Sequence, residues 1–178
     1  MSLEIRWLVP AAIYAAAPQC IAAKYMSVEQ ARTLIFPFAD EFVVRPVQLT
    51  PEKMQEIDKL SGVPGRTPQQ QAWQALSNGT MIGWFFVDQV IGKHELITCA
   101  LGINADGSVR RFQIIEYQEA YGYQVRELKW RNQFVGKTAA SALEVGTDIG
   151  NISGATLSVR HVTDGIKRLL FLHQSVLR

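Results

Sequence analysis

The chain has 178 residues, of which 48% are hydrophobic and 19% are charged, and its formal net charge is +2. This length suits one domain, and the apolar content excludes an intrinsically disordered chain. No run of basic residues is long enough to follow a phosphate backbone, so we expect no nucleic-acid partner. The two cysteines, Cys20 and Cys99, make neither a disulfide framework nor a thiolate metal site, and the histidines lack metal-ligand spacing. We therefore expect no bound metal.

The N-terminal segment has the composition of an export signal. Residues 7–23 carry no charge, follow an arginine and end in small residues, which is typical of a secretory signal peptide. Pro10 and Pro18 interrupt the segment, so a membrane-spanning helix suits it less well. The alternative is an ordinary N-terminal helix packed on the domain. We expect residues 1–23 to be a signal peptide or an N-terminal anchor, residues 24–178 to be the domain, and the location to be periplasmic or otherwise extracytoplasmic.

Two helices are predicted in the first third of the chain. Ser27 and Gln30 have the spacing of a capping box, which predicts a helix over residues 26–35. Thr50 is followed by a proline at the first helical position, and this second helix is expected to close at Gly62.

Strands are predicted mainly in the middle of the chain. Residues 41–49 resemble a strand, whereas residues 63–80, rich in Gly, Pro, Gln, Ser and Asn, suggest a long loop or a frayed helix. Residues 81–128 are rich in β-branched and aromatic side chains and contain a turn at 104–107. Apolar residues recur at helical intervals over 157–177. The predicted class is α+β, an antiparallel sheet packed with helices and ending in a C-terminal helix after a glycine-rich loop.

The glycine-rich loop carries the clearest chemical signal. It combines glycines with hydroxyl side chains just before the last helix: Gly146, Gly150, Gly154, Ser153, Thr156 and Ser158. Glycines let backbone approach a ligand, and a helix N-terminus attracts anions such as phosphate. The alternative is a plain helix start with Ser153 or Thr156 as its N-cap. Farther along the helix, Lys167 and Arg168 are expected on a solvated basic face, with contact to phosphate or an acidic partner as the alternative.

Residues 151–158, Asn-Ile-Ser-Gly-Ala-Thr-Leu-Ser, resemble the flavinylation motif of FMN-binding domains, Asp-x-x-Ser/Thr-Gly-Ala-Thr/Ser. Such domains occur in the C subunit of the sodium-translocating NADH:quinone oxidoreductase and in the G subunit of the Rnf complex. In that family a flavin transferase joins FMN, through its phosphate, to the hydroxyl of the last threonine. The resemblance implies that this residue is Thr156. It extends over about residues 27–175 and implies that residues 24–178 form an FMN-binding domain.

The resemblance also implies the other cofactor contacts. The residues around the attachment point would form its cradle: Asn151, Ser153, Gly154, Ala155, Leu157 and Ser158. Glu119-Ala-Tyr-Gly122-Tyr resembles the family's Glu-Thr-Pro-Gly-Leu-Gly segment, which implies that Glu119 and Gly122 lie near the flavin ring. Two departures stand out: Asn151 replaces the usual Asp, and residues 120–121 lack the usual Thr-Pro.

A few other side chains are candidates for a functional role. His94 follows Gly92-Lys93 and is either a flavin contact or a solvated turn residue, and Lys137 is a candidate for neutralising a phosphate. Ser158 and His161 are three residues apart on one helix face. Nothing supplies an oxyanion hole or a third orienting group, so we expect no hydrolytic catalysis.

Taken together, these features predict an exported flavoprotein that carries FMN and transfers electrons between redox partners. We expect an electron-transfer module more than a stand-alone oxidoreductase, and no residue is assigned a catalytic role. The expected partners are a flavin transferase for maturation and a membrane or soluble redox protein. One alternative is a flavin-free or noncovalent ligand-binding or sensor domain, which Asn151 favours. Another is a reductase that acts directly on an extracellular acceptor.

Overall fold

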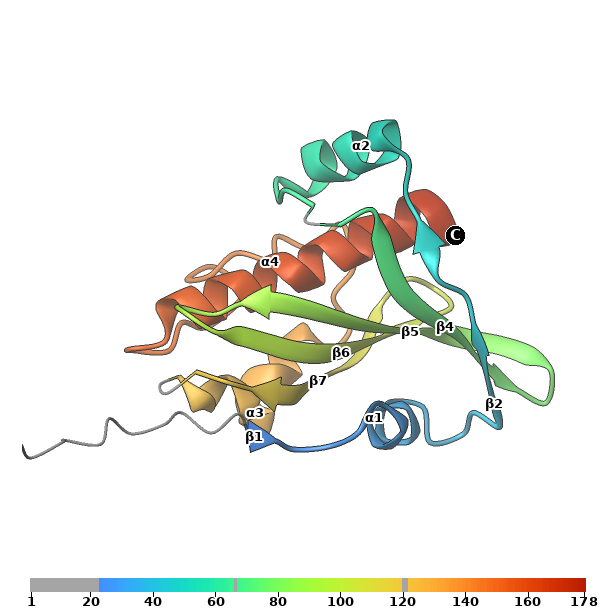
Figure 1. Ribbon diagram of the computed structural model, residues 1–178, viewed down its shortest axis with the longest axis horizontal. Helices are drawn as coiled ribbons and strands as arrows, with labels where there is room; N and C mark the ends of the chain where they lie inside the picture. Colours follow the sequence, from blue (N-terminus) through green and yellow to red (C-terminus); the bar gives the residue numbers. More distant parts are fainter. Residues whose placement is uncertain (1–22, 66, 120–121) are drawn as a thin grey trace, which may run out of the picture.

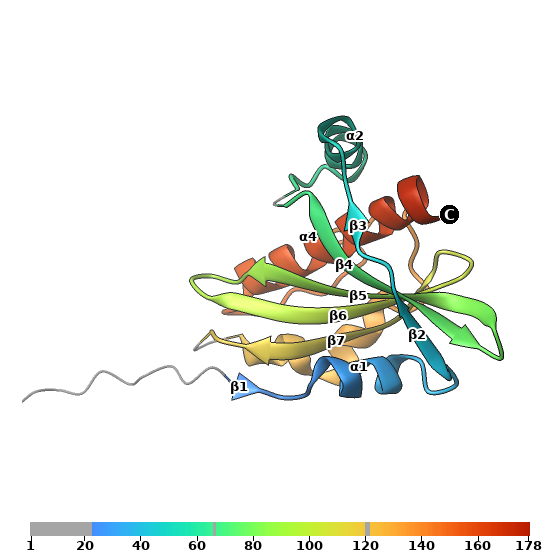
Figure 2. The same cartoon turned by 45° about the vertical axis from the view of Figure 1, so that its right-hand side comes forward.

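The computed structural model describes residues 23–65, 67–119 and 122–178. Within these residues, seven strands form an antiparallel sheet in the order β1-β7-β6-β5-β4-β2, with β3 paired to β4. Helix α1 packs on one face of this sheet and helix α4 on the other, as Figures 1 and 2 show. The α+β class predicted from the sequence is therefore confirmed, with the C-terminal helix following the glycine-rich loop.

The elements follow one another along the chain, and the long loop over residues 135–155 leads into the last helix. The strands are β1 (Ala23–Lys24), β2 (Glu41–Val44), β3 (Val47–Gln48), β4 (Gln69–Ser77), β5 (Thr80–Ile91), β6 (Leu96–Asn104) and β7 (Val109–Tyr117). The helices are α1 (Val28–Ile35), α2 (Pro51–Ser61), α3 (Leu128–Arg131) and α4 (Thr156–Leu172), with 3₁₀ turns at Tyr123–Arg126 and Asn132–Phe134 and a π-helical end at His173–Leu177. The predicted N-terminal signal or anchor segment, with Cys20, lies outside the described residues except for Ala23. None of the helices in the described ranges is long and apolar enough to cross a membrane.

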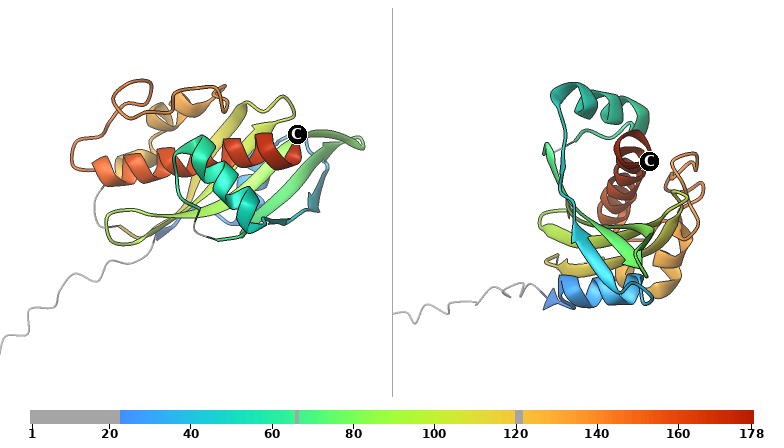
Figure 3. Two further views of the ribbon diagram at one scale, coloured as in Figure 1. Left: turned by 90° about the horizontal axis from the view of Figure 1, so that it is seen from above. Right: turned by 90° about the vertical axis from the view of Figure 1, so that its right-hand side faces the viewer.

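The capping signals of the first two helices are confirmed. Ser27 Oγ accepts a hydrogen bond from the Gln30 backbone N–H at 3.1 Å, and Gln30 Oε1 accepts one from the Ser27 N–H at 2.7 Å. Thr50 Oγ1 accepts from the Lys53 N–H at 3.3 Å, and Gly62 ends α2 with a left-handed φ of 70°. Helix α2 crosses the outer side of α4, as Figure 3 shows.

The prediction for residues 63–80 is wrong, because Gln69–Ser77 of this segment form strand β4. Gln70 and Ala72 are buried on the face toward α4 and alternate with exposed Gln69 and Gln71, whereas Ala75 is buried on the opposite face, in the cluster under α1. They are polar or small, which hides the apolar alternation that marks a strand. Gln70 is accommodated because its Nε2 donates to the Val87 carbonyl at 2.7 Å. The two residues Asn78 and Gly79, both with positive φ, close a tight hairpin with β5.

The predicted β-region is confirmed up to Tyr117 and wrong beyond it. The turn at 104–107 joins β6 to β7, and the Gly107 N–H donates to the Asn104 carbonyl at 2.9 Å. After β7 the chain forms short helical turns. Their aromatic side chains pack on the sheet, because the Phe134 ring lies 5.7 Å from Phe112 and 5.1 Å from Trp130.

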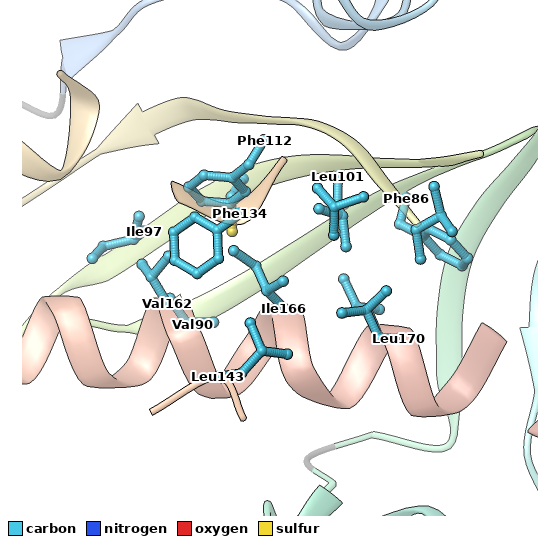
Figure 4. Packing of buried hydrophobic residues seen from close by; sticks show 14 of the residues in the cluster. Phe86, Val90, Ile97, Leu101, Phe112, Phe134, Leu143, Val162, Ile166 and Leu170 are labelled. Carbon is cyan, nitrogen blue, oxygen red and sulfur yellow. The ribbon is translucent and has the colours of Figure 1, made fainter. Parts of the chain in front are cut away.

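The main core lies between the sheet and α4. Val162, Ile166 and Leu170 follow one face of α4 at four-residue spacing and point toward the sheet, as Figure 4 shows. A smaller cluster, including Phe36 and Phe85, fills the space under α1. Burying large apolar side chains on both faces fixes the helix against the strands, so the start of α4 has a defined place beside the turn between β5 and β6.

Candidate functional site

Helix α4 begins without a side-chain cap. Its N-cap position is Ala155, and no side chain accepts a hydrogen bond from the first turn. The alternative prediction that Ser153 or Thr156 caps this helix is therefore wrong. Just before the cap, Gly154 has a φ of 80°, and an added Cβ there would meet nothing within 4 Å. The backbone N–H groups of an uncapped first turn and the helix dipole together favour an anion at this point.

A cavity of about 360 Å³ lies beside this helix start. It is formed by the turn between β5 and β6, the start of the segment after β7, and the loop end and first turn of α4. The residues that line it are Lys93, His94, Glu119, Gly154, Ala155, Thr156, Leu157 and Ser158. Figures 1 and 2 show the β5–β6 turn next to the N-terminal end of α4. The volume lies within the range of about 300–1,000 Å³ that is usual for small-molecule sites.

Thr156 is exposed at the mouth of this cavity. Its Oγ1 accepts a hydrogen bond from Asn151 Nδ2 at 3.3 Å. Together with Asn151, Thr156 also lines a second hollow of about 480 Å³, whose charged lining residues are Glu144, Arg160, Asp164 and Lys167. Thr156 is therefore oriented by its neighbour and borders both cavities.

Ser158 differs from Thr156 in its surroundings. It is only 3% exposed. Burial raises the pKa of Tyr117, and the hydrogen bond between this phenol and the Ser158 side chain opposes the rise. Ser158 therefore lines the inner wall of the cavity with its hydroxyl engaged by the sheet, whereas Leu157 is 41% exposed at the outer edge. Ser153 is exposed and does not line the cavity.

Glu119 holds the wall of the cavity. Its Oε1 accepts hydrogen bonds from the backbone N–H groups of His94 at 2.5 Å and Glu95 at 3.0 Å. His161 holds the other end of the same turn, since its Nδ1 lies 2.5 Å from the Ile91 carbonyl oxygen and 3.0 Å from that of Gly92. Two carbonyl neighbours require the proton of a neutral imidazole to be on Nδ1. These contacts fix where Lys93 and His94 lie.

Gly122 supports the start of α4 and does not itself line the cavity. Its φ is 85°, and an added Cβ would lie 2.8 Å from the Tyr117 hydroxyl and 2.9 Å from the Ala155 Cβ. Only a glycine fits this close contact without displacing its neighbours. The segment at 122 thus packs directly behind the residue that precedes the helix.

The structure differs from the sequence-based predictions for Lys137 and Arg168. Lys137 does not line the cavity, because its Nζ forms an ion pair with Asp148 Oδ2 at 2.9 Å. Burial by itself raises the pKa of Asp148, but hydrogen bonds from backbone N–H groups and from Lys137 outweigh it and lower this pKa. Arg168 is not on a solvated face, since it is only 7% exposed. Among the described residues, no group of three or more His, Cys, Asp or Glu side chains is arranged to hold a metal ion.

Lys93 is the cavity residue that the sequence reasoning missed. The basic residue in the tight Gly-Lys-His turn was a usable signal, because turns between long strands place side chains at the edge of a sheet. Its cationic side chain and the uncapped helix start are both suited to an anionic group. The cavity can therefore accept a phosphorylated ligand of moderate size with Thr156 at its mouth.

Comparison with known proteins agrees with this geometry. Residues 92–170 match the FMN-binding domain family. A solved structure of similar fold is that of NqrC from Shewanella oneidensis, which is 13% identical, with 79% of this chain and 85% of that chain covered and a TM-score of 0.52. At this identity the likeness shows the fold alone. A comparison with curated proteins finds no match. The matched segment runs from the β5–β6 turn into α4 and contains the whole cavity lining, so the resemblance to FMN-binding domains is confirmed and indicates FMN as the cofactor.

Proposed function

We propose that this chain is an electron-transfer flavoprotein whose FMN is joined as a phosphoester to Thr156 Oγ1. The observation that carries the proposal is the exposed Thr156 hydroxyl in the uncapped first turn of α4, at the mouth of the 360 Å³ cavity. The family match over residues 92–170 supports FMN as the group that occupies this site.

The residues present fit such a cofactor. The backbone N–H groups of the first turn of α4 would face the phosphate, and Lys93 would add a positive charge. Asn151 would keep the threonine hydroxyl in place through its amide. Glu119 would act indirectly, because its carboxylate holds the turn that carries Lys93 and His94. When bound, FMN supplies one- and two-electron chemistry, and attachment through its phosphate leaves the isoalloxazine ring unmodified.

The location and partners are also proposals. The uncharged segment 7–23 supports export, so we place the protein in the periplasm or another extracytoplasmic compartment, either free or anchored at its N-terminus. A flavin transferase would load the cofactor, and a membrane or soluble redox protein would exchange electrons with it.

The test is the intact mass of the denatured protein after export in a host that supplies a flavin transferase. We expect an added mass of one FMN less one water, lost in Thr156→Ala and kept in Thr147→Ala. Thr147 is the matched control because it is an exposed threonine in the same loop, lies outside the motif at 151–158 and does not line the cavity. An unmodified mass, with a known acceptor protein labelled in parallel, would contradict covalent attachment.

A second candidate is a domain of the same fold that binds FMN noncovalently or binds another ligand. The identity of residue 151 favours it, because an amide cannot accept the proton of the threonine hydroxyl. Denaturing the purified protein separates the two candidates. Flavin absorbance that stays with the denatured chain supports the covalent form, and absorbance released into the filtrate supports the noncovalent form.

A further inference from the structure

Arg168 is a buried cation that forms no ion pair with another side chain in the described part of the structure. Its side chain is on α4, and the residue is only 7% exposed. Its Nε is buried and has no hydrogen-bond partner in the described part of the chain. The ion pairs found between side chains of the described residues are Arg32–Glu29, Lys53–Glu56 and Lys137–Asp148, and none includes Arg168. Because a buried charge is unfavourable unless it is paired, this guanidinium is suited to an anion that comes from outside the chain.

The guanidinium borders a cavity of about 360 Å³, separate from the one at Thr156. This cavity lies between α4, the end of β5 and the loop after α2. An added Cβ at Gly65 in that loop would lie 3.1 Å from Asp58 Oδ1, 3.2 Å from Arg168 Nη2 and 3.3 Å from Nε, so the loop backbone passes directly against the guanidinium. The apolar part of the lining comes from Val63, Pro64 and Val90.

The charges around the cavity restrict the ligand. A guanidinium offers pairs of donors in one plane, which match a carboxylate. Asp88 and Asp164 also line the cavity and make interactions of their own, and Asp58 Oδ1, beside the guanidinium, accepts a hydrogen bond from the Gly65 N–H at 2.7 Å. Their negative charge disfavours a phosphate dianion more than a singly charged carboxylate. His161, also in the lining, is already held by the carbonyls of Ile91 and Gly92.

We propose that this second cavity binds a small monocarboxylate, with the carboxylate on the Arg168 guanidinium and the apolar part against Val63, Pro64 and Val90. The site is independent of the proposed flavin attachment. Arg168 follows Thr156 by twelve residues, which is about 18 Å along the helix.

The first test is calorimetric titration of the full chain with sodium butyrate at constant ionic strength. We expect binding to the wild type and a loss of affinity of about tenfold or more in Arg168→Met, which keeps an unbranched apolar side chain but removes the charged guanidinium. Arg160→Met is the matched control, because Arg160 is exposed on the same helix and lies outside this cavity. The affinity of this variant for butyrate should equal that of the wild type. Equal affinity in all three proteins, or no binding of butyrate to the wild type, would overturn the proposal.

A second measurement does not depend on whether Arg168→Met folds. In the wild type, the ¹H–¹⁵N resonance of the Arg168 Nε–H should shift on addition of butyrate and stay in place with butyramide, which has the same apolar part but no charge. A response to inorganic phosphate stronger than that to butyrate, or an equal response to butyramide, would contradict a carboxylate site. Neither result bears on FMN, whose attachment is measured separately by mass.

Discussion

The Asn151 amide donates a hydrogen bond to the Thr156 hydroxyl, with 3.3 Å between Nδ2 and Oγ1. This contact sets the direction of the hydroxyl oxygen and leaves the hydroxyl proton free to be donated elsewhere. An amide has no basic atom that could take up that proton, whereas a carboxylate at the same place would have one. The residue that orients the proposed attachment point is thus also the one that limits its reactivity.

Replacing Asn151 by Asp should therefore speed covalent loading of FMN. A carboxylate near Thr156 Oγ1 can accept the hydroxyl proton as the phosphoester forms, and we expect a rate increase of about tenfold or more. The measurement is the fraction of chain with added FMN mass, followed in time with a purified flavin transferase. Asn151→Ala is the control, because it removes the orienting hydrogen bond and adds no base. Equal rates for the Asp and Ala variants would contradict this role of residue 151.

Gly122→Ala should destabilise the start of α4. The new Cβ would lie 2.9 Å from that of Ala155 and 2.8 Å from the Tyr117 hydroxyl, in addition to the strain of a positive φ. We expect a loss of about 1–3 kcal/mol in the free energy of unfolding and a lower FMN content. Gly136→Ala is the matched control, because Gly136 has a φ of 78° and nothing within 4 Å of an added Cβ. Urea denaturation measures the free energy of unfolding of both variants, and Gly136→Ala should be the more stable of the two.

Glu119→Ala should loosen the turn between β5 and β6. It removes the acceptor of the His94 and Glu95 N–H groups. We expect the free energy of unfolding to fall by about 1–3 kcal/mol and the hydrogen exchange of these two amides to become faster. Glu119→Gln keeps a carbonyl oxygen that can accept the same bonds, so its exchange rates should stay nearer the wild type's. If both variants exchange at the wild-type rate, Glu119 does not hold the turn.

His173 should make the protein less stable in mild acid. Burial, followed by the nearby Arg178, lowers the pKa of His173, while Asp106 opposes the shift. Below the ordinary histidine pKa of about 6.5 the unfolded chain binds a proton that the folded chain does not. The free energy of unfolding should thus fall as the pH drops from about 6.5 toward the lower folded pKa, by at most about 1.4 kcal/mol per pH unit. Urea denaturation between pH 7.5 and 5.5 measures this slope, and His173→Leu should flatten it.

The sequence predicted the parts of the fold that depend on neighbouring residues. Ser27 and Thr50 cap helices through atoms three positions away, so their pattern is visible in the chain itself. Strand β4 was missed because its fully buried residues are Gln70, Ala72 and Ala75, which are polar or small and lie on two different faces, and the buried glutamine is satisfied by a carbonyl seventeen residues away. The Asn78-Gly79 pair was the local hairpin signal that was not used.

The candidate site also combines features set by neighbouring residues with features set by residues that are distant in the sequence. The motif at 151–158 points to Thr156, and the structure places this residue at a cavity. The role of Glu119 could not be read from the sequence, since its partners are 24 and 25 residues away. The burial of Arg168 depends on the loop after α2, which is distant in the sequence. The spacing of residues along α4 therefore cannot predict this burial.

The two residues that hold the β5–β6 turn, Glu119 and His161, contact its two ends and come from distant parts of the sequence. The motif at 151–158 is complete as a linear sequence as soon as it is synthesised. The cavity beside it exists only after β7 has joined the sheet and α4 has docked. The proposed attachment of FMN would therefore have an order in which folding precedes loading. A substitution that slows the docking of α4 would delay the cofactor without changing any residue that contacts it.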